Sequence, residues 1–292
     1  MGRKPIQYDL FPGPTPLEDE IIARALSHDP VARYVGYSGG DDSLVALHLA
    51  MMTVPGCRPV SFITGIGVQA TIDHRRRVCD RYGWDLLEIH AKEDCGQDYD
   101  HYVMKWGFPG PPLHQRFYNR LKGRCVEKLV RDAKAATGVG PKSRRKVMIM
   151  TGIRKDESQR RMGYGGREVN FVGSQMWVNP LYHRPKSWFM DYIKAHNLPR
   201  NPVSVTLGMS GECLCGAFAH KGELAMVRTV CPRTAQRIED LQERVRAAGH
   251  AWGWEEYPPE TKVARKAKAS KHHHPLCVGC EKTPYMFEET AA

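Results

Sequence analysis

The sequence predicts an α/β fold: a parallel, five-stranded sheet with helices on both faces, followed by a small cysteine-containing C-terminal region. Short apolar segments alternate with segments of helical periodicity, which is typical of a parallel sheet. Apolar runs such as the VMIM of residues 147–150 suit strands that are buried on both sides. With 292 residues, the chain is long enough for one large domain with an appendix.

The elements are expected in a simple order. A Pro- and Gly-rich arm leads into a helix over residues 16–27, where acidic residues in the early turns favour the helix dipole. Strands are expected over residues 31–37, 59–64, 85–90, 146–151 and 176–181. Further helices are expected over residues 43–52, 71–82, 114–136, 187–197 and 233–248. Residues 94–112, with their GFPGPP stretch, are expected to be irregular.

Charge and apolar content limit the classes of function. Lys and Arg number 43 against 32 Asp and Glu, which gives a formal net charge of +11. This surplus favours a polyanionic partner, although a merely basic soluble protein fits equally. No stretch approaches the ~20 apolar residues of a membrane span, and residues 1–14 lack the apolar core of a secretory signal. We therefore expect a cytoplasmic protein whose nine cysteines are buried, metal-binding or reactive.

The most informative stretch is SGGDDS, residues 38–43, between the first strand and its helix. Its glycines let the backbone approach a ligand, and its amides and hydroxyls, with the helix N-terminus, suit phosphate oxygens. Asp42 would be repelled by a phosphate unless Mg²⁺ lies between them. The loop contains no lysine and is not a Walker loop. An ordinary Asp/Gly turn is the alternative interpretation.

Ser-Gly-Gly-x-Asp-Ser after a strand resembles the PP-loop of the N-type ATP pyrophosphatases, which have the Rossmann-like adenine nucleotide α-hydrolase fold. In those enzymes the loop holds the pyrophosphate end of ATP, and AMP is transferred to a substrate oxygen. Two further motifs, TGIRKDESQRR at residues 151–161 and VNPLYHRPKSWFMDYIKAHNLPRNPV at residues 178–203, resemble the phosphoadenosine phosphosulfate (PAPS) reductase-like family. The blocks occur in the family's order over roughly residues 30–220.

The residues of the second motif suit this resemblance. Gly152 would let a nucleotide lie against the backbone. The guanidinium groups of Arg154, Arg160 and Arg161 match phosphate or sulfate. A surface helix start held by salt bridges is the alternative. The expected catalytic residues are Asp42, Ser43, Arg154 and Arg161. The expected nucleotide-binding residues are Tyr37, Ser38, Gly39, Gly40, Asp41, Asp42, Ser43, Thr64, Thr151, Gly152, Ile153, Arg154 and Glu157.

Two close cysteine pairs, Cys213 with Cys215 and Cys277 with Cys280, predict a four-thiolate site. The softness of the thiolate ligands does not distinguish Zn²⁺ from a [4Fe–4S] cluster, because both accept four thiolates. Sulfur-handling relatives often carry a [4Fe–4S] cluster, so the resemblance favours iron–sulfur. The alternative is two unrelated pairs of reduced thiols.

The chain is thus expected to comprise an N-terminal arm and helix (1–28), a PP-loop nucleotide-binding domain (29–205) and a Cys-rich metal or iron–sulfur region (206–292). It lacks the Glu-Cys-Gly-Leu-His tail of assimilatory PAPS reductases and the adjacent-cysteine motif of many bacterial APS reductases. Because Asp42 and Ser43 are retained, the resemblance implies an ATP- and Mg²⁺-dependent adenylating enzyme. It would release pyrophosphate in the course of sulfur transfer.

Nucleic acid is the expected acceptor, because the positive charge could follow a phosphate backbone. Within the resemblance, tRNA thiolases and DNA phosphorothioation enzymes are the precedents. A sulfur-donor protein is the expected partner, no membrane is involved, and a homodimer is left open. The alternatives are a reductase of PAPS or a related sulfonucleotide and a non-catalytic nucleotide-binding module.

Overall fold

The computed structural model describes residues 16–155 and 167–256, so the predicted site residues Glu157, Arg161, Cys277 and Cys280 lie outside the described part. Its strands are β1 (Ala32–Gly36), β2 (Cys57–Ile63), β3 (Leu87–His90), β4 (Val147–Met150), β5 (Val169–Val172) and β6 (Gln175–Val178). Its longer helices are α1 (Pro16–Leu26), α2 (Asp41–Thr53), α3 (Gln69–Tyr82), α6 (Arg124–Ala136), α8 (Lys186–Ala195) and α11 (Pro232–Ala247). Shorter helices are α4 (Tyr99–Trp106), α5 (Pro111–Tyr118), the π-helix η1 (Asn119–Gly123), α9 (Pro202–Leu207) and α10 (Glu223–Val230).

The strands form one sheet in the order β3-β2-β1-β4-β6-β5. β1 pairs in parallel with β2 on one side and β4 on the other, so that Val35 lies opposite both Pro59 and Met150. β3 and β6 extend the parallel pairing, which confirms the predicted α/β class and its five parallel strands. The sixth strand, β5, was not predicted; it pairs antiparallel with β6, with Asn170 opposite Trp177.

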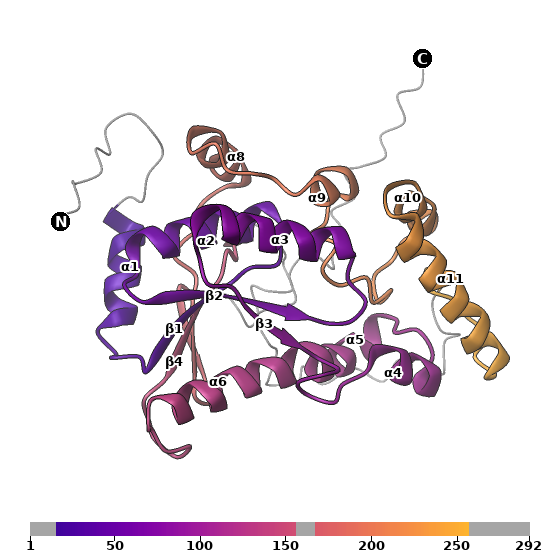
Figure 1. Ribbon diagram of the computed structural model, residues 1–292, viewed down its shortest axis with the longest axis horizontal. Coiled ribbons are helices and arrows are strands. Elements are labelled where there is room, and N and C mark those ends of the chain that lie inside the picture. Colours follow the sequence, from indigo (N-terminus) through magenta and orange to yellow (C-terminus); the bar gives the residue numbers. More distant parts are fainter. Residues whose placement is uncertain (1–15, 156–166, 257–292) are drawn as a thin grey trace.

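The side chains of β4 show how the sheet divides the core. Val147 and Ile149 pack into a core with residues of α4, α5, α6 and α11, whereas Met148 and Met150 pack into a second core with α1, α2 and α8. All four side chains are fully buried. Since successive side chains of a strand point to opposite faces, an unbroken apolar run is what a strand covered on both faces requires. Figure 1 shows α2 and α3 on one side of the sheet and α6 on the other.

The prediction of irregular structure over residues 94–112 is wrong where α4 forms. The Asp98 side chain caps this helix by accepting a hydrogen bond of 3.0 Å from the Asp100 amide, and Gly107 ends it with a φ of 76°. The predicted helix over residues 114–136 is present as α5 and α6, but η1 interrupts it with a π-type turn, a feature frequent at functional sites.

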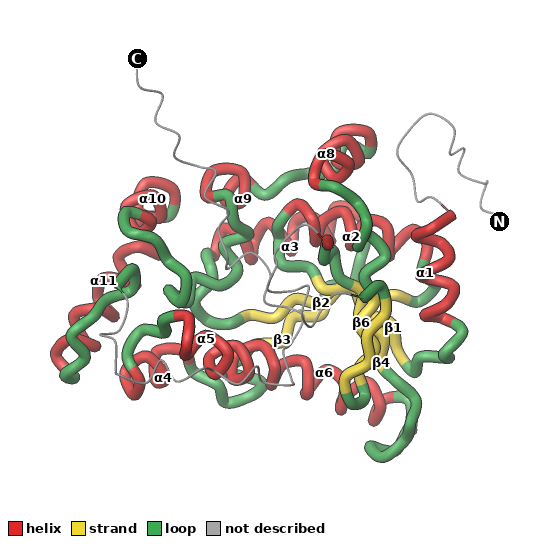
Figure 2. Tube along the Cα trace, turned by 180° about the vertical axis from the view of Figure 1, so that it is seen from behind, coloured by secondary structure: helices red, strands yellow, loops and turns green. Residues whose placement is uncertain are grey.

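The region after β6 folds back over the carboxyl edge of the sheet. α10 packs against α11, and α11 packs against α4 (Figure 2). Trp254 is buried beside them, and its indole N–H donates to the main-chain oxygen of Leu214 at 2.7 Å. In the described part of the chain, no helix is both long and apolar enough to cross a membrane.

Candidate active site

The loops after β1 and β4 meet at the carboxyl edge of the sheet. The strand order turns here, because the chain continues from β1 to β2 on one side and later returns to β4 on the other. In open α/β sheets, ligands bind at this switch point. The two loops touch through their backbones: a Cβ on Gly152 would lie only 2.2 Å from the main-chain oxygen of Asp42.

The loop of residues 38–43 is held by its own serines. The Ser43 hydroxyl donates to the main-chain oxygen of Gly40 at 2.8 Å, accepts from the Ser38 amide at 3.2 Å and lies 3.0 Å from the Ser38 hydroxyl. Gly39 adopts a φ of 86°, a conformation that favours glycine. The loop is therefore curled around the N-terminus of α2.

The N-terminus of α2 is suited to an anion. The helix begins at Asp41, and its N-cap residue, Gly40, offers no side-chain acceptor to the first turn. The first amides of a helix have no partner within the helix, and the helix dipole places positive charge beside them. An anion at this position would satisfy both requirements.

Three cations surround the two carboxylates of this loop. Asp42 accepts from the Arg154 Nε at 2.9 Å and from the Lys186 Nζ at 2.5 Å. Asp41 pairs with both the Nε and Nη2 of Arg200, at 3.0 and 2.9 Å, which raises the pKa of that arginine. Within the described part of the chain, this cluster thus contains three positive and two negative side chains.

Lys186 and Arg200 were not predicted as site residues. They stand in the third motif, between predicted elements, and no spacing rule connects them with a loop 144–159 residues earlier in the sequence. The only signal in the sequence was that each is a basic residue that directly follows a proline.

The geometry around Asp42 is compatible with Mg²⁺ in one respect. Mg²⁺ often takes a single protein carboxylate and completes its coordination with substrate phosphates and water. Lys186 is about half exposed (48%), so it could leave Asp42 for a phosphate and free a carboxylate oxygen. Among the described residues, no group of three or more His, Cys, Asp or Glu side chains could hold a metal on its own.

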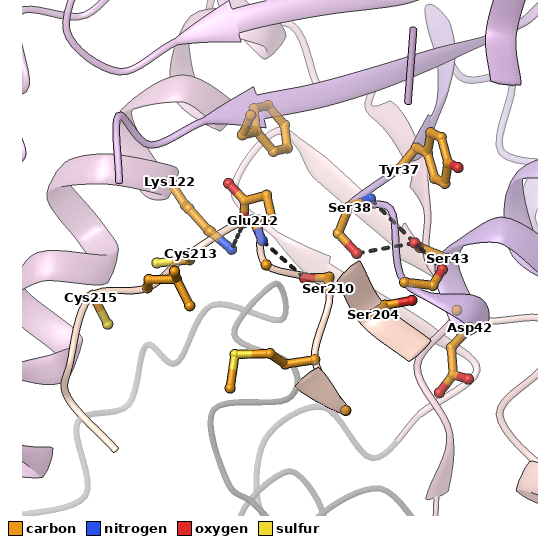
Figure 3. A pocket seen from close by; sticks show the side chains of 18 of the residues that line it. Tyr37, Ser38, Asp42, Ser43, Lys122, Ser204, Ser210, Glu212, Cys213 and Cys215 are labelled. Carbon is orange, nitrogen blue, oxygen red and sulfur yellow. Dashed lines mark hydrogen bonds and ion pairs between the residues drawn. The ribbon is translucent and has the colours of Figure 1, made fainter. Parts of the chain in front are cut away.

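A cavity of about 250 Å³ connects this loop with the first cysteine pair. Most of the predicted nucleotide-binding residues line it: Tyr37, Ser38, Gly40, Asp41, Asp42, Ser43, Thr151, Gly152 and Ile153. Cys213 and Cys215 line the same cavity. Figure 3 shows Ser38, Ser43 and Asp42 on one side, and Cys213 and Cys215 on the other.

Of the predicted residues that the structure describes, three do not line the cavity. The Thr64 hydroxyl donates to the main-chain oxygen of Glu212 at 3.2 Å and so supports the cavity wall. Arg154 donates a hydrogen bond to Asp42, which does line the cavity, and its guanidinium lies over the Phe189 ring. Gly39 turns the loop without facing the cavity.

The segment that carries the first cysteine pair is fixed from both ends. The Thr71 hydroxyl donates to Ser210 O at 2.9 Å, and the Val68 amide donates to Gly211 O at 2.7 Å. At the other end, the Tyr99 hydroxyl donates to Cys215 O at 2.9 Å. The described residues thus provide two thiols on one rigid segment, which fits half of a four-thiolate site.

Burial also sets the ionisation of the Tyr37 phenol. Its side chain is 2% exposed, and burial raises the pKa of Tyr37 well above its ordinary value. The Tyr37 hydroxyl is therefore protonated at neutral pH.

Fold and cavity together define an α/β protein with a glycine-rich loop at the switch point of a parallel sheet. Residues 33–205, more than half of the chain, match the phosphoadenosine phosphosulfate reductase domain. The chain belongs to this family, as its three motifs predicted.

Individual relatives are more distant. The adenosine 5′-phosphosulfate reductase of Mesorhizobium japonicum is 27% identical over 234 residues, which cover 80% of this chain and 77% of that protein. Among solved structures, the PAPS reductase from Candida auris is 18% identical, covers 71% of this chain and 95% of its own, and gives a TM-score of 0.46. The tRNA thiolase NcsA from Methanococcus maripaludis, with its [4Fe-4S] cluster, is 14% identical. The match covers 79% of this chain and 76% of the thiolase, with a TM-score of 0.43.

Proposed function

We propose that this protein binds ATP at the loop of residues 38–43 and transfers AMP to an acceptor, with release of pyrophosphate, as a step in sulfur transfer. The observation that carries the proposal is the shared cavity. It joins a loop suited to phosphates with two thiols, Cys213 and Cys215, which would handle sulfur beside the bound nucleotide.

The chain's own residues have distinct roles in this proposal. The amides at the start of α2 bind the β- and γ-phosphates, with Ser38 and Ser43 as further donors. Lys186 and Arg200 exchange their carboxylate partners for phosphate oxygens. Arg154, together with Arg161 outside the described residues, stabilises the charge that develops at the α-phosphate.

Bond changes follow from this arrangement. An oxygen of the acceptor attacks the α-phosphorus, the bond between the α-phosphorus and its bridging oxygen breaks, and pyrophosphate leaves. The acceptor then carries AMP, and a sulfur nucleophile from a sulfur-donor protein displaces it. Mg²⁺, held by Asp42, would neutralise charge on the leaving pyrophosphate.

The cysteines would hold the second cofactor. Cys213, Cys215, Cys277 and Cys280 supply four thiolates, a set that accepts a [4Fe–4S] cluster or Zn²⁺. We favour the cluster, which the four cysteines would hold beside the nucleotide. Two of the four thiols already line the cavity, which supports a role in the reaction over a purely structural one.

Nucleic acid is the proposed acceptor, on the basis of the net charge of +11. A sulfonucleotide reductase is the second candidate, favoured by the 27% identity to an adenosine 5′-phosphosulfate reductase over most of both chains. In that case the cavity would hold the nucleotide's own sulfate, and a thiol donor would release it as sulfite.

One assay separates these candidates. Purified protein is incubated with ATP, Mg²⁺, a reduced sulfur donor and either tRNA or DNA, and pyrophosphate is measured. A parallel reaction supplies PAPS or adenosine 5′-phosphosulfate with a thiol, and sulfite is measured. Pyrophosphate release that disappears in Asp42→Ala, but persists in Asp73→Ala on the exposed face of α3, supports adenylation.

The other outcomes are equally informative. Sulfite release without pyrophosphate release would establish the reductase instead. Tight ATP binding with neither product would identify a non-catalytic nucleotide-binding module.

A further inference from the structure

The cavity wall contains polar atoms that no described residue satisfies. Buried side-chain atoms without a hydrogen-bond partner in the described part of the chain include Tyr37 Oη, Arg75 Nε, Arg75 Nη1 and Glu212 Oε1. All three residues line the cavity. A buried polar group without a partner is destabilising, so a cluster of them indicates a place where a ligand binds.

Arg75 is the centre of this cluster. It lies on α3, and only 1% of it is exposed. Burial lowers the pKa of Arg75, although arginine remains charged at neutral pH. Arg75 is therefore a cation that has been removed from water at a cost in free energy, and two of its N–H donors, Nε and Nη1, have no acceptor among the described residues.

The nearby carboxylates are largely committed to other cations. Glu212 pairs through Oε2 with the Nζ of Lys122 at 2.5 Å, and both side chains are well buried (Figure 3). Glu88, the other carboxylate whose charge acts on Arg75, is bound by Arg76 at 2.7 Å. Arg75 and Lys122 are thus two buried cations beside one carboxylate, Glu212, whose ion pair is with Lys122, and Arg75 forms no ion pair with a described residue.

Arg75 also lies directly beside the phosphate-suited loop. A Cβ added to Gly39 would be 3.4 Å from Arg75 Cγ. Tyr37, whose hydroxyl is a further donor, precedes this loop.

We propose that Arg75 and Tyr37 form a second anion-binding subsite of the cavity, which takes a tetrahedral oxyanion of the sulfate or phosphate type. The forked donors of arginine match two oxygens of such a group, and the Tyr37 hydroxyl matches a third. This subsite deepens the proposed function and rests on it: next to the loop that binds the triphosphate, it would hold either a separate sulfur or phosphorus oxyanion or a further anionic group of the nucleotide itself.

The test uses inorganic sulfate as the probe and calorimetry on the full-length protein, alone and with a saturating non-hydrolysable ATP analogue. The wild type is compared with Arg75→Met and with the matched control Arg76→Met, because Arg76 is the next residue on α3 and forms an exposed pair with Glu88. Arg75→Met is expected to weaken sulfate binding at least tenfold, and Arg76→Met to change it less than twofold.

The two sources of the anion give different results in the wild type. If sulfate still binds when the ATP analogue is saturating, and binding depends on Arg75, the subsite serves a separate oxyanion. If the analogue displaces sulfate, and sulfate binding in the absence of the analogue depends on Arg75, the subsite serves a group of the nucleotide. If Arg75→Met binds sulfate as tightly as the wild type does, with or without the ATP analogue, the inference is wrong.

Stability separates a binding role from a structural one. Since Arg75→Met removes a buried cation that forms no ion pair with a described residue, its melting temperature without sulfate is expected to equal or exceed that of the wild type. A lower melting temperature would mean that Arg75 is structural and would contradict the proposal.

Should Arg75→Met fail to fold, Arg75→Lys retains the charge but loses the fork, and is expected to weaken sulfate binding at least threefold; unchanged binding refutes the subsite. Failure of the wild type to bind the ATP analogue would instead count against the proposed function. Binding of the analogue together with an absence of sulfate binding would count against this subsite alone.

Discussion

Gly152→Ala probes the backbone contact on which the candidate site depends. The added Cβ would lie 2.2 Å from the main-chain oxygen of Asp42 and 2.6 Å from its carbonyl carbon. Carbon contacts are comfortable near 3.5 Å, so the two loops would have to separate by about 1 Å. Both atoms belong to the main chain, and no side-chain rotation can relieve the clash.

We expect this separation to lower the free energy of unfolding by about 3 kcal/mol, as overpacking of a buried contact does. It would also move the start of α2 relative to the loop after β4, and a displacement of about 1 Å at a reacting centre can reduce the rate about 100-fold. Urea unfolding and ATP-dependent pyrophosphate release measure the two effects.

Gly140→Ala is the matched control, since a Cβ at this position would meet no atom within 4 Å. Its free energy of unfolding should stay within about 0.5 kcal/mol of the wild type. The reasoning is refuted if Gly152→Ala is as stable and as active as Gly140→Ala.

Three further predictions address other parts of the molecule. Lys186→Met should weaken ATP binding about tenfold in calorimetry, because a charged hydrogen bond to phosphate is lost, whereas Lys194→Met on the same helix should not. Burial, with His196 nearby, lowers the pKa of His48 to about 4, so the unfolded chain takes up a proton there between pH 6.5 and 4 while the folded protein does not. The free energy of unfolding should therefore be retained above pH 6.5 and fall by up to about 3 kcal/mol toward pH 4. In urea unfolding, His48→Gln lacks the titrating imidazole and should show a smaller fall over the same pH range. Anaerobically purified wild type should contain about four iron and four sulfide per chain; Cys213→Ser should lose most of both and Cys95→Ser should not, and one zinc in their place would contradict the cluster.

The sheet was predictable because its strands are short apolar runs that must be buried on both faces. Residues 147–150 show this most clearly, since their side chains alternate between the two cores. β5 escaped prediction because it is an edge strand whose side chains are half exposed, so that its pattern carries little signal. α4 was missed because its cap depends on one aspartate within an aromatic, proline-bounded segment.

The candidate site was predictable as far as local sequence determines it. The glycines and serines of residues 38–43 reflect the tight turn that the backbone makes between a strand and a helix, and this turn is present as predicted. The structure places it where the strand order turns, at the carboxyl edge of the sheet. The partners of its carboxylates were not predictable, since Lys186 and Arg200 reach the loop only through the folding of distant segments. The same holds for Arg75, which reads as one of three consecutive surface arginines in the sequence but is buried.

The most direct test of the central claim is a crystal structure with α,β-methylene-ATP and Mg²⁺. The account predicts the β- and γ-phosphates on the amides of residues 39–43, with the metal on Asp42 and Lys186 turned from its carboxylate to a phosphate oxygen. An analogue bound elsewhere, with the Asp42–Lys186 pair intact and no phosphate at the start of α2, would contradict it.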